Sequence, residues 1–61
     1  MDNRELKSRL EQGLDELYAA VKKTTDERTA IAIGKNIKYH QIAYVRLVGY
    51  NYIPRRRQND R

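Results

Sequence analysis

The sequence predicts an all-α fold, a helical hairpin with one helix over about residues 3–23 and a second over about 26–48. Apolar residues recur at intervals of three and four in both segments, and residues that favour helix N-caps precede each one. Only one stretch has the β-branched and aromatic content of a strand, and it has no convincing partner strand. We expect one domain, residues 1–53, followed by a basic, flexible C-terminal tail, residues 54–61.

The first helix begins with an N-cap pattern. Asp2 can accept hydrogen bonds from the free amides of the first turn, and Glu5 follows three residues later, as in a capping box. Five apolar residues then fall within roughly 80° of the circumference, at about 100° per residue. They are Leu6, Leu10, Leu14, Leu17 and Val21. Such a narrow seam is typical of a helix that packs against another helix.

The seam does not continue as one long helix, because Arg28, Lys35 and Lys38 occupy the positions where further apolar residues would be needed. Thr24 and Glu27 have the spacing of a second capping box, so we predict that Thr24 caps the second helix. The turn at Thr24 and Thr25 is then short, and a short turn makes the two helices antiparallel neighbours.

The second helix has more apolar circumference than one neighbour can bury. One group is expected to face the first helix: Ala30, Ile33, Ile37, Tyr44 and Val48. Ile31, Ile42 and Val45, here named the aliphatic edge, lie further round, so that the arc spans roughly 200° against about 100° for one neighbour. The chain has no third helix, so the sequence predicts a homodimeric four-helix bundle. Otherwise the aliphatic edge stays partly exposed or packs under the tail.

The end of the second helix is predicted at Gly49, a residue type that favours the left-handed conformation just after a helix. Residues 50–53 have extended character, and Pro54 disfavours helix at the residue before it. The alternative is that residues 42–53 form a strand, because β-branched and aromatic residues are concentrated there.

Composition excludes several classes of site. With no cysteine and one histidine, the chain can form no disulfide and no zinc site of its own, and we expect no metal and no cofactor. It has no glycine-rich phosphate loop, and its acids are not expected to converge in a pocket, so we do not expect an enzyme. The longest apolar run is far short of the ~18 residues of a membrane span, and no signal-peptide pattern opens the chain. We therefore expect a cytoplasmic protein.

Charge is distributed unevenly along the chain, whose net charge is +5. Residues 1–30 carry six Lys and Arg against seven Asp and Glu, whereas residues 31–61 carry seven against one. This asymmetry favours a polyanionic partner or an acidic protein surface, although it could also serve solubility alone.

One face of the second helix combines cations with tyrosines. Its members, here named the basic stripe, fall within about 60° of one another and opposite the apolar face; they are Arg28, Lys35, Tyr39, Arg46 and Tyr50. The stripe leads toward Arg55, Arg56 and Arg57. Arginine binds phosphate with two charge-assisted hydrogen bonds, and tyrosine can hydrogen-bond phosphate or stack on an unpaired base. The pattern predicts a dimeric regulatory protein that binds the backbone of DNA or RNA.

Other interpretations of these residues remain open. The basic stripe could be an ordinary solvated face, and Ala30 with Gly34 gives only a poor match to a helix-turn-helix unit. The protein could instead be an inhibitor or adaptor that docks another protein through the aliphatic edge or residues 50–53, while the basic tail speeds their encounter.

Overall fold

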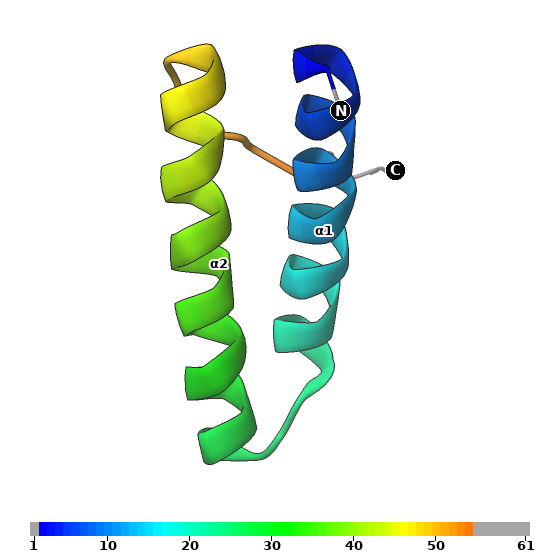
Figure 1. Ribbon diagram of the computed structural model, residues 1–61. Helices are drawn as coiled ribbons and strands as arrows, with labels where there is room; N and C mark the ends of the chain where they lie inside the picture. The colour runs from blue at the N-terminus through cyan, green and yellow to red at the C-terminus, as the bar shows by residue number, and fades with distance from the viewer. Residues whose placement is uncertain (1, 55–61) are drawn as a thin grey trace.

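The computed structural model describes residues 2–54 and consists of two antiparallel helices, α1 (Asn3–Lys23) and α2 (Glu27–Val48), packed side by side (Figure 1). The predicted all-α helical hairpin is therefore confirmed. The bounds of α1 are those predicted, and α2 begins one residue later than predicted.

The N-terminus of α1 follows the prediction. The Asp2 carboxylate accepts a 2.8 Å hydrogen bond from the Glu5 backbone N–H, which satisfies one of the free amides of the first turn. At the other end the Thr24 N–H donates to the Ala20 carbonyl at 3.1 Å, and Lys22 and Lys23 lie in the last turn. A cap at each end fixes the length of α1.

The predicted capping role of Thr24 is wrong. The N-cap of α2 is Asp26, whose carboxylate accepts from the Thr29 N–H at 2.9 Å and from the Thr29 hydroxyl at 2.6 Å. Thr24 instead ends α1, and its hydroxyl accepts from the Asp26 N–H at 3.3 Å. The carboxylate is the stronger acceptor for the positive end of a helix. The hydrogen bonds from Thr29, first from its hydroxyl and then from its amide, lower the pKa of Asp26.

The core of the hairpin is small. Within residues 2–54 only Leu14 and Tyr44 are fully buried. The rest of the α1 seam is half-buried, apart from Leu6, which is 39 % exposed. Two helices thus cover each other along one line and leave the flanks of their apolar faces accessible.

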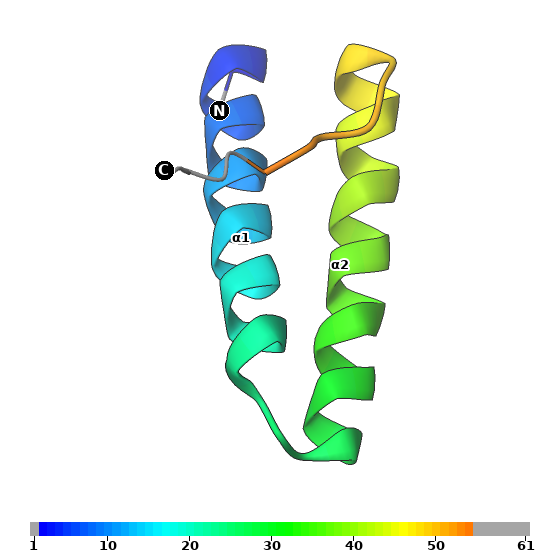
Figure 2. The same ribbon diagram turned by 180° about the vertical axis from the view of Figure 1, so that it is seen from behind.

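The chain turns back over the hairpin after α2. Gly49 has a φ of 90° and donates its N–H to the Val45 carbonyl at 2.8 Å, so the predicted glycine terminus is confirmed. Residues 50–54, here named the strap, then cross from α2 to α1 over one face of the hairpin (Figures 1 and 2). The alternative strand over 42–53 is wrong, because its first seven residues are the last two turns of α2.

The Gln41 side chain hydrogen-bonds the strap to α2. Gln41 accepts from the Tyr52 N–H at 2.9 Å and donates to the Tyr52 carbonyl at 2.7 Å, so its amide pairs with the strap as a neighbouring backbone would. Asn51 donates to the same Gln41 oxygen at 3.4 Å. The Gln41 bonds satisfy the Tyr52 N–H and carbonyl, which would otherwise need water as their hydrogen-bond partner.

Neither helix of the described chain is both long and apolar enough to cross a membrane.

Candidate nucleic-acid interface

Four members of the basic stripe lie together on the outer side of α2. Arg28, Lys35, Tyr39 and Arg46 are all exposed, Tyr39 with 65 % of its surface accessible. Tyr44 is buried against α1, and at about 100° per residue these four side chains project from the opposite half of the helix. The hairpin therefore presents them to solvent along most of the length of α2.

The cations of this surface have no carboxylate partner within the described chain. The ion pair present there joins the Lys7 Nζ to the Glu11 Oε2 at 3.0 Å, on α1. Arg28, Lys35 and Arg46 make no ion pair with any of residues 2–54, and neither does Lys38, which lies beside the stripe. Their charge is consequently available to an anionic partner rather than neutralised within the hairpin.

The fifth predicted member, Tyr50, does not belong to this face. The prediction placed it there by continuing the helical spacing to residue 50, but α2 ends at Val48. The chain reverses at Gly49, and the Tyr50 ring lies edge-on to the Tyr44 ring with centroids 6.0 Å apart. The predicted binding residues Arg55, Arg56 and Arg57 lie outside the described residues.

The aliphatic edge is exposed next to the basic stripe. Ile31 is 54 % exposed, Ile42 is 41 % exposed and Val45 is half-buried. Ile42 and Val45 form the apolar floor of an open groove of about 390 Å³, which is also lined by Lys38, Gln41, Arg46 and Asn51. This groove joins apolar surface to two cations, Lys38 and Arg46, and the strap forms one of its borders.

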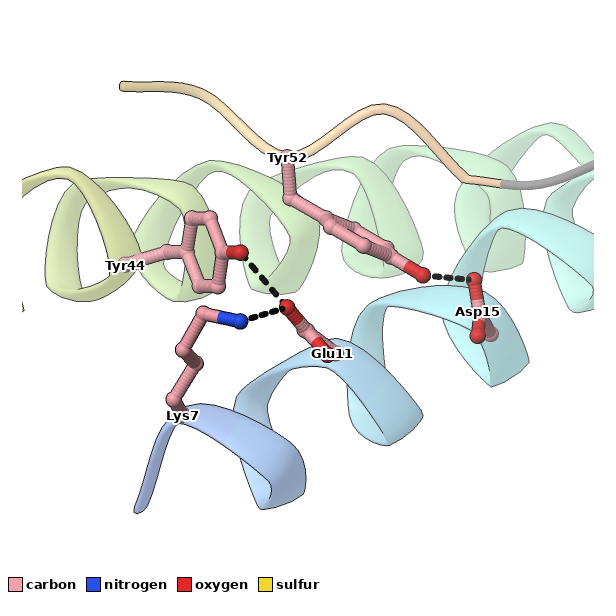
Figure 3. A network of polar contacts seen from close by, with 5 residues as sticks. All are labelled: Lys7, Glu11, Asp15, Tyr44 and Tyr52. Atoms are coloured by element: carbon pink, nitrogen blue, oxygen red, sulfur yellow. Dashed lines mark hydrogen bonds and ion pairs between the residues drawn. The ribbon is translucent and has the colours of Figure 1, made fainter. Parts of the chain in front are cut away.

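A network of tyrosines and carboxylates on the strap side of the hairpin was not predicted (Figure 3). The buried Tyr44 hydroxyl on α2 donates to the Glu11 Oε2 on α1 at 2.6 Å, and the Lys7 Nζ meets the same oxygen. The carboxylate thus serves a neutral donor and a cation together, and it links the two helices.

The second half of the network brings in the strap. The Tyr52 hydroxyl donates to the Asp15 Oδ1 at 2.9 Å, and its ring packs edge-on against Tyr44 with centroids 5.4 Å apart. Gln41 donates to the Tyr18 hydroxyl at 3.3 Å. Four of the five tyrosines, Tyr18, Tyr44, Tyr50 and Tyr52, therefore take part in holding the strap and both helices together.

The electrostatics of this network suit a structural role. The hydrogen bond to Glu11, and then burial, raise the pKa of Tyr44 far above that of free tyrosine. The bond to Glu11 also raises the pKa of the half-buried Lys7. Both groups keep their protons at neutral pH, so Tyr44 remains a hydrogen-bond donor to Glu11 between the two helices.

One signal in the sequence pointed to the network. Gln41 falls within the apolar arc of α2, and a polar residue at such a position needs hydrogen-bond partners. Glu11 lies about 60° from Leu14 at about 100° per residue, at the margin of the seam, which is where a carboxylate can reach the facing helix. The sequence did not indicate which residues would hydrogen-bond with Gln41 and Glu11.

No three His, Cys, Asp or Glu side chains within residues 2–54 are grouped so that they could hold a metal ion. No family model, curated protein or solved structure compared with this chain matches it.

Proposed function

We propose that this protein is a small, dimeric, non-enzymatic binding protein that contacts the phosphate backbone of nucleic acid through the basic stripe. The observation that carries the proposal is the alignment of Arg28, Lys35 and Arg46 on one exposed helix face with no carboxylate partner in the described chain. Tyr39 lies among them and would orient a phosphate or stack on an unpaired base. Arg55, Arg56 and Arg57 would add phosphate contacts beyond the hairpin.

The spacing of these cations suits an extended polyanion better than a small anion. At ~1.5 Å per residue, Lys35 lies about 10 Å along α2 from Arg28, and Arg46 lies about 16 Å further on. Arg46 lies too far along the helix to share a phosphate with Arg28 or Lys35, so the three would bind more than one phosphate along a backbone. Contacts of this kind fix position but read little sequence.

Fluorescence anisotropy with short duplex and single-stranded oligonucleotides near 0.15 M salt tests this proposal. The double variant Lys35→Gln, Arg46→Gln should lower the slope of log affinity against log salt by about 1.8 units on duplex DNA, since each lost phosphate contact contributes about 0.9. The matched control Arg4→Gln, Arg9→Gln removes the same charge from exposed positions on α1 and should change the slope far less. Equal changes in the two double variants would mean that only net charge matters and that the stripe is not a site.

The tail has its own test. Replacing Arg55, Arg56 and Arg57 with alanine should lower the slope by about 2.7 units if each neutralises one phosphate of duplex DNA. An unchanged slope would remove the tail from the interface.

The groove beside the strap favours a second candidate function, that of an adaptor or inhibitor of another protein. Its floor of Ile42 and Val45, with Lys38 and Arg46 at the rim, suits an amphipathic segment that carries acidic residues. Oligonucleotide binding weaker than about 10⁻⁴ M, below the usual non-specific affinity, would favour this candidate over the first.

We also propose that two hairpins associate as a four-helix bundle. A chain of this size is marginal as a monomer, and within residues 2–54 it buries only Leu14 and Tyr44 completely. Association would cover apolar surface that the single hairpin leaves accessible.

A further inference from the structure

The face of α1 opposite the strap carries no charge. Relative to the buried Leu14, five residues project to this side within about 80° of arc at about 100° per residue. They are Leu6, Leu10, Gly13, Leu17 and Ala20. They follow one another at steps of four, three, four and three, the spacing of a helix seam. Leu10 and Leu17 are only half-buried in the hairpin, and Leu6 and Ala20 are exposed.

The adjoining face of α2 also lacks charged residues. Relative to the buried Tyr44, the residues that project to this side are Thr29, Ala32, Asn36, His40, Ala43 and Leu47. Ala32 and Ala43 are exposed, and Leu47 is half-buried. The two groups together are here named the charge-free face. Charged residues make up 34 % of the chain, and not one of them falls on it.

Contacts on both sides of the hairpin fix where this face lies. An added Cβ at Gly13 would come within 3.3 Å of the His40 ring, so the two groups adjoin across the helix pair. His40 is held there by its Nδ1, which lies 2.8 Å from the Asn36 carbonyl oxygen. Gln41, Asp15 and the strap meet on the other side. In Figure 2 the strap crosses in front of the helices, so Figure 1 looks onto the charge-free face.

We infer that a second copy of this chain covers the charge-free face. The inference rests on the dimer proposed above and names its contact surface. Chains with a net charge of +5 repel one another wherever their cations meet, and this face itself carries none. Its glycine and alanines leave space between the leucines, so two such faces can interdigitate around a two-fold axis.

The area of the face is sufficient for a dimer. Two helices of about 21 residues form a surface about 30 Å long and about 20 Å wide, at ~1.5 Å per residue and ~10 Å between axes. Each chain would then bury roughly 600 Å², and the pair roughly 1,200 Å², which reaches the lower end of stable protein interfaces.

The aliphatic edge, from which the sequence predicted dimerisation, is the competing surface. Lys38 lies between Ile31 and Ile42 on that side of α2, and Lys35 and Arg46 flank it. A two-fold axis through this edge would bring cations of the two chains together. Burial of only three aliphatic side chains would offset little of the electrostatic repulsion between these cations. Pairing through the charge-free face keeps the aliphatic edge free for another partner and leaves the basic stripe at the border of the interface.

Sedimentation analysis of two matched pairs of variants tests the inference. Ala43→Glu and Ile42→Glu place the same charge on adjacent exposed residues of α2, one on the charge-free face and one on the aliphatic edge. Ala20→Glu and Ala19→Glu do the same on α1, with Ala19 exposed on the strap side. Ala43→Glu and Ala20→Glu should weaken the dimer at least about 100-fold, because each buries an unpaired carboxylate. Ile42→Glu and Ala19→Glu should remain dimeric, and circular dichroism should show helix in all four.

A gentler measurement covers the case in which a glutamate variant fails to fold. The chain has no cysteine, so Ala43→Cys and Ile42→Cys each create a single thiol. Alkylation of the thiol at position 43 should slow as protein concentration rises, and alkylation at position 42 should not. If alkylation slowed with rising protein concentration at position 42 and not at position 43, the charge-free face would not be the interface, although the dimer would stand. Loss of the dimer only in Ile42→Glu would have the same meaning. A wild-type chain that stays monomeric up to millimolar concentration would overturn both, and the oligonucleotide titration would still decide nucleic-acid binding.

Discussion

Removing one hydroxyl from Tyr44 should destabilise the hairpin measurably. The Tyr44→Phe variant loses the 2.6 Å bond to Glu11 while the ring keeps its packing against Tyr50 and Tyr52. A hydrogen bond to a charged group contributes about 1.5–3 kcal/mol. The Glu11 side chain is 30 % exposed and keeps its ion pair with Lys7, so water can replace part of the lost hydrogen bond. We therefore expect the free energy of unfolding to fall by about 1.5–2 kcal/mol. For a domain of this size that lowers Tm by roughly 6–16 °C.

Thermal unfolding followed by circular dichroism, with both proteins at one concentration, measures this loss. Tyr39→Phe is the matched control, since it removes the same hydroxyl from a side chain that is 65 % exposed, and it should change stability by less than about 0.5 kcal/mol. A double-mutant cycle with Glu11→Gln isolates the pair, and its coupling should be about 1 kcal/mol or more.

The pH dependence gives a second measure of the same bond. The pKa of Tyr44 is raised in the folded state, so folding holds a proton that the unfolded chain releases above about pH 10. Its contribution is fully present below that pH and is lost as pH rises beyond it. The wild type should therefore lose stability more steeply than Tyr44→Phe above pH 10, and Lys7 adds a slope common to both. Equal slopes together with equal Tm values would refute the assignment of this bond as a main link between the helices.

Four further perturbations test single features of the fold. Gly34→Ala should stabilise the protein by about 1 kcal/mol in denaturant titrations, because an added Cβ meets nothing within 4 Å and alanine is the better helix former. Gly49→Ala should instead cost about 1–2 kcal/mol, because its φ is 90°. Asp26→Ala should lower the Tm at pH 7, because the two hydrogen bonds that its carboxylate accepts from Thr29 are lost. Since the folded pKa of Asp26 is lowered, this difference should be present above pH 4 and shrink as the carboxyl protonates in stronger acid. Gln41→Leu should abolish hydrogen-exchange protection of the Tyr52 amide while leaving helix content unchanged, and persistent protection would show that the strap is held by other contacts.

Periodicity predicted the helices well because the packed face of a helix needs apolar residues at intervals of three and four. The seam from Leu6 to Val21 and the glycine at position 49 gave the bounds of α1 and the end of α2 closely. The prediction chose the wrong N-cap for α2, because Thr24 and Asp26 both suit that position. Only the structure shows that Thr24 is already used to close α1.

The strap and its network could not be predicted in the same way. Tyr52 meets Asp15 across 37 positions of sequence, and a contact of that range leaves no period to detect. The same holds for Tyr44 and Glu11, which are 33 positions apart. The basic stripe was predictable as far as α2 extends, and it failed only at Tyr50, where the helix had ended.

The Gln41 contact with Tyr52 also has a consequence for the order in which the chain folds. A helical hairpin forms from contacts of short range and assembles outward from its turn, so α1 and α2 can pair early. The strap can complete its contacts only when both helices are in place, because its partners Gln41 and Asp15 lie on different ones. We therefore expect complete docking of the strap to come last, after α1 and α2 have paired. A hairpin caught before that step would keep its helices but lack its tyrosine cluster, so tyrosine fluorescence should change after the circular dichroism signal does.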